Sequence, residues 1–265
     1  MLTNRNLRLF LKFARETAVG AGNILIKKAR MHNEVHFKGR VNLVTGADIA
    51  SEKYIIRNIE NKFPDHSLLA EEAAATDKGS EFKWVIDPLD GTTNYAHHFP
   101  FYAVSIALEY QGKIVLGVVY DPEREELFSA FRGGGSFLNR KRNRITSERE
   151  LSHSLLGTGF PYDVGTSQEN NLNNYTCFAR VSRGIRRAGS AALDLCYVAC
   201  GRLDGFWELK LSPWDTAAGI IIVEEAGGKV TDFEGKKFSI YDHYILASNG
   251  HIHRQMQRVL AGHCE

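Results

Sequence analysis

The sequence predicts a fold that joins an antiparallel sheet covered by helices to a second region in which strands and helices alternate. Two amphipathic helical patterns open the chain, β-rich runs joined by tight turns follow, and short apolar runs alternate with helical patterns from about residue 154 onward. The chain has 265 residues, of which 43% are hydrophobic, enough for one large domain or two small ones sharing an interface. The polar stretch 143–150 predicts a boundary there. We therefore expect an α+β half over 1–145 and an α/β half over 146–265.

The first half should begin with two helices. Apolar residues recur at three- and four-residue steps over 7–29 and over 49–63. Asp48 precedes the second pattern, at the position of an N-cap. Apolar runs rich in β-branched and aromatic residues then predict strands at 67–70, 82–86, 102–110, 114–120 and 126–132. Gln111-Gly112 separates two of these runs and predicts a hairpin, so the sheet should be largely antiparallel.

The second half has a different rhythm. Short apolar runs predict strands at 154–159, 184–187, 205–208, 229–231 and 244–247. Helical patterns lie between them at 169–182, 190–201 and 215–226, and a further helix closes the chain. This alternation is typical of α/β architecture.

Composition excludes several classes of function. The net charge is only +2, so the chain has no strong field and gives no reason to expect nucleic-acid or membrane binding. No apolar run reaches eighteen residues, and the charged N-terminus does not resemble a signal peptide. The four cysteines form no C-x-x-C pair, so we expect buried free thiols and a cytoplasmic location.

The most informative stretch is Trp84-Val-Ile-Asp87-Pro88-Leu-Asp90-Gly91-Thr92. A buried strand should deliver Asp87 at its end, where Pro88 stiffens the turn. Asp90 follows three residues later, close enough for both carboxylates to face one cation. Gly91 and Thr92 stand where a short helix should begin, and free N–H groups there suit a phosphate. The alternative is an ordinary surface β-turn, since Asp, Pro and Gly are turn residues.

Carboxylates beside a phosphate cradle make electrostatic sense only with divalent cations between them. Mg²⁺ prefers carboxylate, carbonyl and phosphate oxygens, and two such ions can clamp both sides of a displacement at phosphorus. Further acidic ligands should therefore come from other element ends, and Glu71 and Asp215 are the candidates. Glu71 could instead be a solvated loop residue, and Asp215 could be a helix N-cap.

A family resemblance covers almost the entire chain. WVIDPLDGTTNY at 84–95 and WDTAAGIIIVEEAGG at 214–228 resemble the two signatures of the inositol monophosphatase family, and TGFPYD at 158–163 and AGSAALDLCY at 188–197 resemble its intervening blocks. The resemblance implies a layered αβαβα sandwich of the sugar-phosphatase type, with metal ions in the cleft between its halves. It also implies Mg²⁺-dependent hydrolysis of myo-inositol monophosphate by an activated water, inhibition by lithium, and a homodimer.

The same resemblance assigns roles to individual residues. It places Glu71, Asp87 and the carbonyl of Leu89 on a first Mg²⁺, Asp87, Asp90 and Asp215 on a second, and Glu71 on a third, weaker ion. Gly91 and Thr92 would bind phosphate through their N–H groups, and Thr92 and Asp48, together with the metal ligand Glu71, would form the catalytic set that prepares the attacking water. Substrate contacts would come from Glu208, Gly189, Ala191, Asp90 and Asp215. The alternative for Glu208 is a surface carboxylate at a strand end.

Three other functions stay open. The nearest is another phosphatase of the superfamily, acting on fructose 1,6-bisphosphate, histidinol phosphate or a 3′-phosphonucleotide. A different class is a regulatory binding partner of the transcription machinery, as among some bacterial relatives. The third is an inactive scaffold, although no expected ligand is missing from the sequence.

Overall fold

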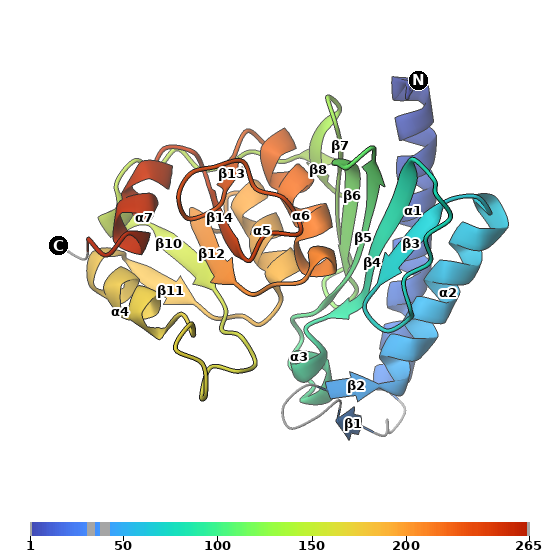
Figure 1. The fold of residues 1–265 in the computed structure, drawn as a ribbon, viewed down its shortest axis with the longest axis horizontal. Coiled ribbons are helices and arrows are strands. Elements are labelled where there is room, and N and C mark those ends of the chain that lie inside the picture. The colour runs from blue at the N-terminus through green and yellow to red at the C-terminus, as the bar shows by residue number, and fades with distance from the viewer. Residues whose placement is uncertain (1, 31–34, 38–42, 264–265) are drawn as a thin grey trace.

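The computed structural model describes residues 2–30, 35–37 and 43–263, and it has five layers (Figure 1). A helical layer covers one face of a seven-stranded sheet, a second helical layer lies between that sheet and a five-stranded one, and a third covers the far face of the smaller sheet. The predicted αβαβα sandwich is therefore confirmed. The boundary near residue 145 stays a prediction.

The first layer holds α1 (Asn4–Ala29) and α2 (Gly46–Lys62). α1 begins with a capping box between Thr3 and Asn6, and its small residues bury one face against the sheet. Both predicted helices are confirmed. α2 begins before Asp48, however, so Asp48 lies buried in the first turn and is not the N-cap.

The seven-stranded sheet has the order β3-β4-β5-β6-β7-β8-β9. Only β3 and β4 run parallel, and every other neighbouring pair is antiparallel, as the hairpin signals predict. Its strands are β3 (Ser67–Ala70), β4 (Phe82–Asp90), β5 (Ala103–Tyr110), β6 (Lys113–Asp121), β7 (Glu126–Phe131), β8 (Gly135–Leu138) and β9 (Lys141–Arg142). The last two strands follow a glycine-rich stretch that had no strand prediction.

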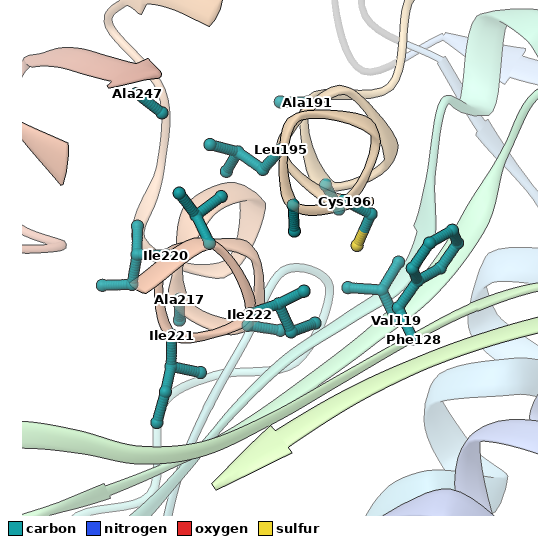
Figure 2. Close-up of a cluster of buried hydrophobic side chains, with 14 of the residues drawn as sticks. Val119, Phe128, Ala191, Leu195, Cys196, Ala217, Ile220, Ile221, Ile222 and Ala247 are labelled. Atoms are coloured by element: carbon teal, nitrogen blue, oxygen red, sulfur yellow. The ribbon is translucent and has the colours of Figure 1, made fainter. Parts of the chain in front are cut away.

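The middle layer consists of α5 (Ala191–Ala199) and α6 (Pro213–Glu225). Figure 2 shows their apolar side chains packed together, with Val119 and Phe128 of the large sheet on one side and Ala247 of the small sheet near the other. α6 is apolar on all sides because both sheets cover it. It approaches β6 so closely at Gly117 that a Cβ there would lie 2.6 Å from the carbonyl oxygen of Ala218.

The five-stranded sheet has the order β11-β10-β12-β14-β13 and mixed direction, with β10 parallel to both of its neighbours and β14 antiparallel to both of its own. Its strands are β10 (Leu155–Thr158), β11 (Gly184–Arg186), β12 (Gly205–Leu209), β13 (Lys229–Thr231) and β14 (Tyr244–Ser248). α4 (Leu172–Val181) and α7 (His253–Leu260) cover its outer face. The remaining elements are α3 (Thr92–Ala96), a short helix at Leu151–His153, and the hairpin of β1 (Val35–Phe37) and β2 (Leu43–Thr45).

The cysteines depart in part from the prediction. Cys196 is a buried free thiol and Cys200 a partly buried one, as expected. Cys177, on α4, is instead disulfide-bonded, so the expectation of a free thiol is wrong there. Cys264 lies outside the described residues. Cysteine usage therefore no longer supports a reducing compartment. Within the described part of the chain, no helix is long and apolar enough to cross a membrane.

Candidate active site

Strand β4 is longer than the sequence predicts and includes the central motif as far as Asp90. It does not stop before Asp87 but continues to Asp90, and its pairing with β5 shifts between these two residues. Pro88 lies inside the irregular part, where its missing N–H costs no ladder bond. The Ser51 hydroxyl of α2 donates to the carbonyl of Pro88 at 2.9 Å, and the Leu89 N–H donates to Asp87 Oδ1 at 2.9 Å. The first layer and the local backbone thus fix the direction of the Asp87 carboxylate.

Asp90 joins the two halves of the molecule. Its Oδ2 accepts hydrogen bonds from the Ser190 hydroxyl at 2.6 Å and from the Ala192 N–H at 2.8 Å, both at the N-terminus of α5. Ser190 is the N-cap of α5, and its own oxygen accepts from the Leu193 N–H. The prediction omitted Ser190, although a serine directly before a helical pattern is a signal that could have identified it.

Asp215 comes from the middle layer. It lies at the third position of α6, behind Pro213, and its Oδ2 accepts from the Ser212 N–H at 2.7 Å. The N-cap alternative is therefore wrong, because Ser212 occupies that position. The capping contact uses one carboxylate oxygen and directs the side chain into the cleft, which Asp215 lines together with Glu71 and Asp90.

Thr92 connects the 87–92 loop to α2. Its hydroxyl oxygen lies 3.1 Å from Asp48 Oδ1 and 3.1 Å from the carbonyl oxygen of Leu89. Gly91, directly before α3, has φ 96°, a left-handed conformation that favours glycine, and a Cβ there would lie 3.0 Å from the carbonyl oxygen of Phe101. The loop can therefore make this turn only with a glycine at position 91.

The 188–190 turn packs next to this loop, and it is held there by Asn94, a residue that the sequence did not predict as part of the site. The Asn94 amide donates to the carbonyls of Phe101 and Ala188, at 2.7 and 2.8 Å. It thereby holds the 188–190 turn, in which Gly189 has φ 89°, against the start of α3. The predicted contacts Gly189 and Ala191 consequently line the same cleft as Gly91 and Thr92.

Burial and mutual repulsion disfavour the ionised form of the acidic side chains and so raise their pKa values. Desolvation, followed by the charges of Glu71, Asp90 and Asp215, raises the pKa of Asp87 well above its ordinary value. Desolvation is also the first cause at the other two positions: it raises the pKa of Asp90 to about 6 and the pKa of Asp215 well above normal. Among the described residues, no lysine or arginine forms an ion pair with Asp87, Asp90 or Asp215.

This donor set fits a divalent cation by its chemistry. Each of Asp87, Asp90 and Asp215 uses one oxygen for a backbone or hydroxyl donor and keeps a second oxygen. Over the described residues, however, no three His, Cys, Asp or Glu side chains are already arranged as a metal-binding group. The residues gathered here therefore match the ligand types that Mg²⁺ prefers, and binding would have to draw their second oxygens together.

The cleft has a volume of about 270 Å³ and extends past Asp90 to a second acidic end. Glu208 on β12 and Asp194 on α5 line this end, and both are buried. Burial first, and then the charge of Asp90, raise the pKa of Glu208 to about 8, while Arg187 opposes the shift. Glu208 is therefore inside the cleft, and the surface-carboxylate alternative is wrong. Asp194 and Arg187 have no counterpart among the predicted residues.

The outer wall contains Tyr162 and Lys210, which the prediction also missed. Tyr162 lies in TGFPYD, a segment in which the sequence predicts no site residue. Partial desolvation, and after it the charges of Glu71, Asp215, Asp90 and Asp87, raise the pKa of Tyr162 to about 12. The predicted residues that line this one cleft are Glu71, Asp90, Gly91, Thr92, Gly189, Ala191, Glu208 and Asp215. Asp48 and the Leu89 carbonyl adjoin it through their hydrogen bonds with Thr92, and Asp87 accepts from the Leu89 N–H.

Comparisons with known proteins agree on one family. The model of the inositol monophosphatase family matches residues 6–265. An inositol-1-monophosphatase of Synechocystis is 43% identical over 97% of this chain and 90% of that protein. Nus factor SuhB of Pseudomonas aeruginosa is 42% identical over 90% of this chain and 91% of that protein. The solved inositol monophosphatase of Anabaena superposes with a TM-score of 0.89 at 44% identity, covering 97% of both chains.

A cleft between two sheets that is lined by acidic side chains and by a glycine-containing turn before a helix is an arrangement that suits a phosphatase. The chain belongs to the inositol monophosphatase family.

Proposed function

We propose that this phosphatase hydrolyses myo-inositol monophosphate to inositol and phosphate with bound Mg²⁺. The observation that carries the proposal is that Asp87, Asp90 and Asp215 form no ion pair with a lysine or arginine among the described residues, although burial disfavours their charge, and that they lie next to a loop that can hold a phosphate. Glu71, Asp87, the Leu89 carbonyl, Asp90 and Asp215 would hold two to three ions. When bound, Mg²⁺ would neutralise the phosphate and lower the pKa of a coordinated water.

The chain's own residues would align the reactants. Gly91 directly precedes α3 and Thr92 begins it, and the first N–H groups there have no partner within the helix and can donate to phosphate oxygens. The lone pairs of the Thr92 hydroxyl oxygen can accept a hydrogen bond from the attacking water. When this hydroxyl donates to Asp48, it can take up the proton of the water while its own proton passes to the Asp48 carboxylate. Such alignment supplies most of what protein side chains contribute to phosphoryl transfer.

Glu208 and the 188–191 turn would bind the leaving group. A buried carboxyl group can accept hydrogen bonds from ring hydroxyls. A second phosphate would instead add negative charge beside Glu208 and Asp194, whose ionised forms burial already disfavours, so we favour a polyol phosphate over fructose 1,6-bisphosphate. A solved relative, 28% identical over 97% of this chain, has inositol monophosphate bound, which supports the choice, although a structure of SaIMPase-II with 2′AMP keeps nucleotides as an alternative.

Phosphate release from a substrate panel tests the proposal. Wild-type protein should release phosphate from inositol 1-phosphate only with Mg²⁺, and faster than from fructose 1,6-bisphosphate, histidinol phosphate or 2′AMP. Asp87→Asn should abolish release, whereas Asp65→Asn, at an exposed carboxylate outside the cleft, should not. Equal release with and without Mg²⁺ would refute the proposal.

A second candidate is association with the transcription machinery, because several relatives are named Nus factor SuhB at 41–42% identity. If this applies here, Asp87→Asn protein should still capture a transcription partner, since the substitution changes only the cleft. As part of the phosphatase proposal above, we also propose that the protein is a homodimer, is inhibited by lithium and lies in the cytoplasm. Light scattering of the purified protein tests the dimer.

A further inference from the structure

The connection between β10 and α4, residues 159–171, forms the outer wall of the cleft. It is the segment between these two elements in Figure 1, and Gly159, Phe160, Pro161 and Tyr162 line the cleft from it. Its ends are tied together, since the Asn171 amide donates to the carbonyl of Gly159 at 2.7 Å and the Trp207 indole donates to Asn171 Oδ1 at 2.9 Å. A loop with joined ends and internal hydrogen bonds holds a defined shape.

Lys210 holds the middle of this loop from the end of β12. Its Nζ donates to Asp163 Oδ2 at 2.9 Å and to Ser167 Oγ at 2.8 Å. Its backbone is left-handed, with φ 60°, a conformation that is unfavourable for residues with a Cβ atom. The two side-chain contacts can offset part of this cost. Asp163, which Lys210 holds, is the residue next to Tyr162.

Tyr162 is an exposed residue of the 159–171 loop. It is 61% exposed, yet it borders the same cleft as Glu71, Asp90 and Asp215. Its hydroxyl makes no hydrogen bond with any other residue that the structure describes. Carboxylates can only accept hydrogen bonds, so a protonated phenol adds a neutral donor on the wall that faces them. Phosphate and hydroxyl oxygens are acceptors that such a donor suits.

We propose that Tyr162 is a substrate-contacting residue whose hydroxyl donates a hydrogen bond to the bound phosphate monoester, and that Lys210 is the positioning residue that keeps Tyr162 over the cleft. The inference rests on the proposed function, because it assumes that a phosphate monoester occupies the cleft. It makes the 159–171 loop a fixed wall. Lys210 acts only through Tyr162.

Steady-state kinetics with inositol 1-phosphate test both roles. Tyr162→Phe removes the donor alone and should raise KM about two- to tenfold, with kcat nearly unchanged, because one hydrogen bond is lost. Lys210→Met should raise KM in the wild-type background and leave it unchanged in the Tyr162→Phe background. Lys210→Arg keeps a cation and should restore most of the affinity.

Hydrogen exchange supplies a readout that does not depend on activity. The Thr166 and Ser167 N–H groups donate to the Asp163 carbonyl, so releasing Asp163 should expose them. Lys210→Met should speed exchange in this loop, and Tyr162→Phe should not. Lys236→Met, which breaks an exposed ion pair with Glu234, is the matched control and should change neither exchange in this loop nor KM.

Three results would overturn the inference: an unchanged KM in Tyr162→Phe, a Lys210→Met effect of equal size in both backgrounds, or unaltered exchange in Lys210→Met. The first two presuppose an active wild-type enzyme, whereas the exchange result does not. If wild-type protein released no phosphate from any ester with Mg²⁺, the proposed function itself would fail, and this inference with it. The two failures are thereby distinguishable.

Discussion

Two buried aspartates of the large sheet differ in how the protein treats their charge. Asp121, at the end of β6, is fully buried and accepts hydrogen bonds from the Glu123 and Arg124 N–H groups and from the Arg124 guanidinium at 2.9 Å. Asp87, on β4, is equally buried but has one backbone donor, and its neighbours are other carboxylates. Burial raises the pKa of both groups, and only at Asp121 does a guanidinium oppose it. The protein thus balances the charge of Asp121 with its own Arg124. The charge of Asp87 has only other carboxylates beside it, so a bound cation would have to balance it.

The largest expected difference lies in activity. Asp87→Asn should lower kcat/KM for inositol 1-phosphate about a thousandfold, because it removes a metal ligand that supports several kcal/mol of charge stabilisation. Its thermal stability without Mg²⁺ should stay the same or rise, since a repelled charge disappears. Phosphate release and a melting curve measure the two effects. A melting temperature clearly below wild type would contradict this account of Asp87.

The second prediction concerns the neutralised site. Arg124→Met should lower the free energy of unfolding by about 2–3 kcal/mol, because it leaves Asp121 buried with only its backbone donors. Activity of the remaining folded protein should not change. Urea titration measures the loss, and Arg124→Lys should recover part of it. If Arg124→Met were as stable as wild type, the contrast between the two aspartates would disappear.

A pH series sharpens the comparison at the second acidic end of the cleft. The pKa of Glu208 is about 8 in the folded protein and near the ordinary 4.5 when unfolded, so the folded state binds more protons between these values. Stability from this group is therefore present below pH 4.5 and is lost as pH rises toward 8. Without Mg²⁺, Glu208→Gln should gain stability over wild type by at least about 1 kcal/mol between pH 5 and pH 8.

Scanning calorimetry at both pH values measures this change. Because the comparison is between variant and wild type, titrating groups that do not interact with Glu208, such as His253, cancel. A difference in melting temperature that stayed constant with pH would show that Glu208 is already ionised at pH 5.

The smallest effect should come from an exposed pair. Lys12 and Glu16 lie 3.8 Å apart on α1, and both side chains are mostly exposed. Glu16→Gln should change stability by less than about 0.5 kcal/mol, since solvent and salt screen such pairs. The same urea titration checks this, and a loss comparable to Arg124→Met would mean that burial does not separate the two kinds of charge.

Much of the fold follows from local patterns in the sequence. The steps of three and four residues located α1 and α2, and the apolar runs located most of the strands, because these signals lie within one element. The ends were less certain: β4 extends through Pro88, since pairing with β5 outweighs the proline, and α2 begins before Asp48. β8 and β9 were missed because they are short and contain polar or glycine residues.

The residues of the site also differ in how well the sequence predicts them. The 87–92 motif is contiguous, so its chemistry could be read directly from the sequence. The Ser190–Asp90 hydrogen bond joins residues a hundred positions apart, and no local pattern reports it. Tyr162 and Lys210 are likewise brought together only by the return of β12 beside β10. Contacts of this kind depend on tertiary packing.

The middle helical layer has a consequence for motion. α6 carries Asp215 and packs against β6 through Gly117, and the neighbouring Gly219 lies so near α5 that a Cβ there would come within 2.5 Å of Leu195. Both sheets therefore pack against the same pair of helices, and a movement of one sheet relative to the other would have to break these close contacts. We therefore expect ligands to enter and leave without a change in the distance between the two sheets, and the acidic side chains to approach a bound cation by rotation about their own bonds.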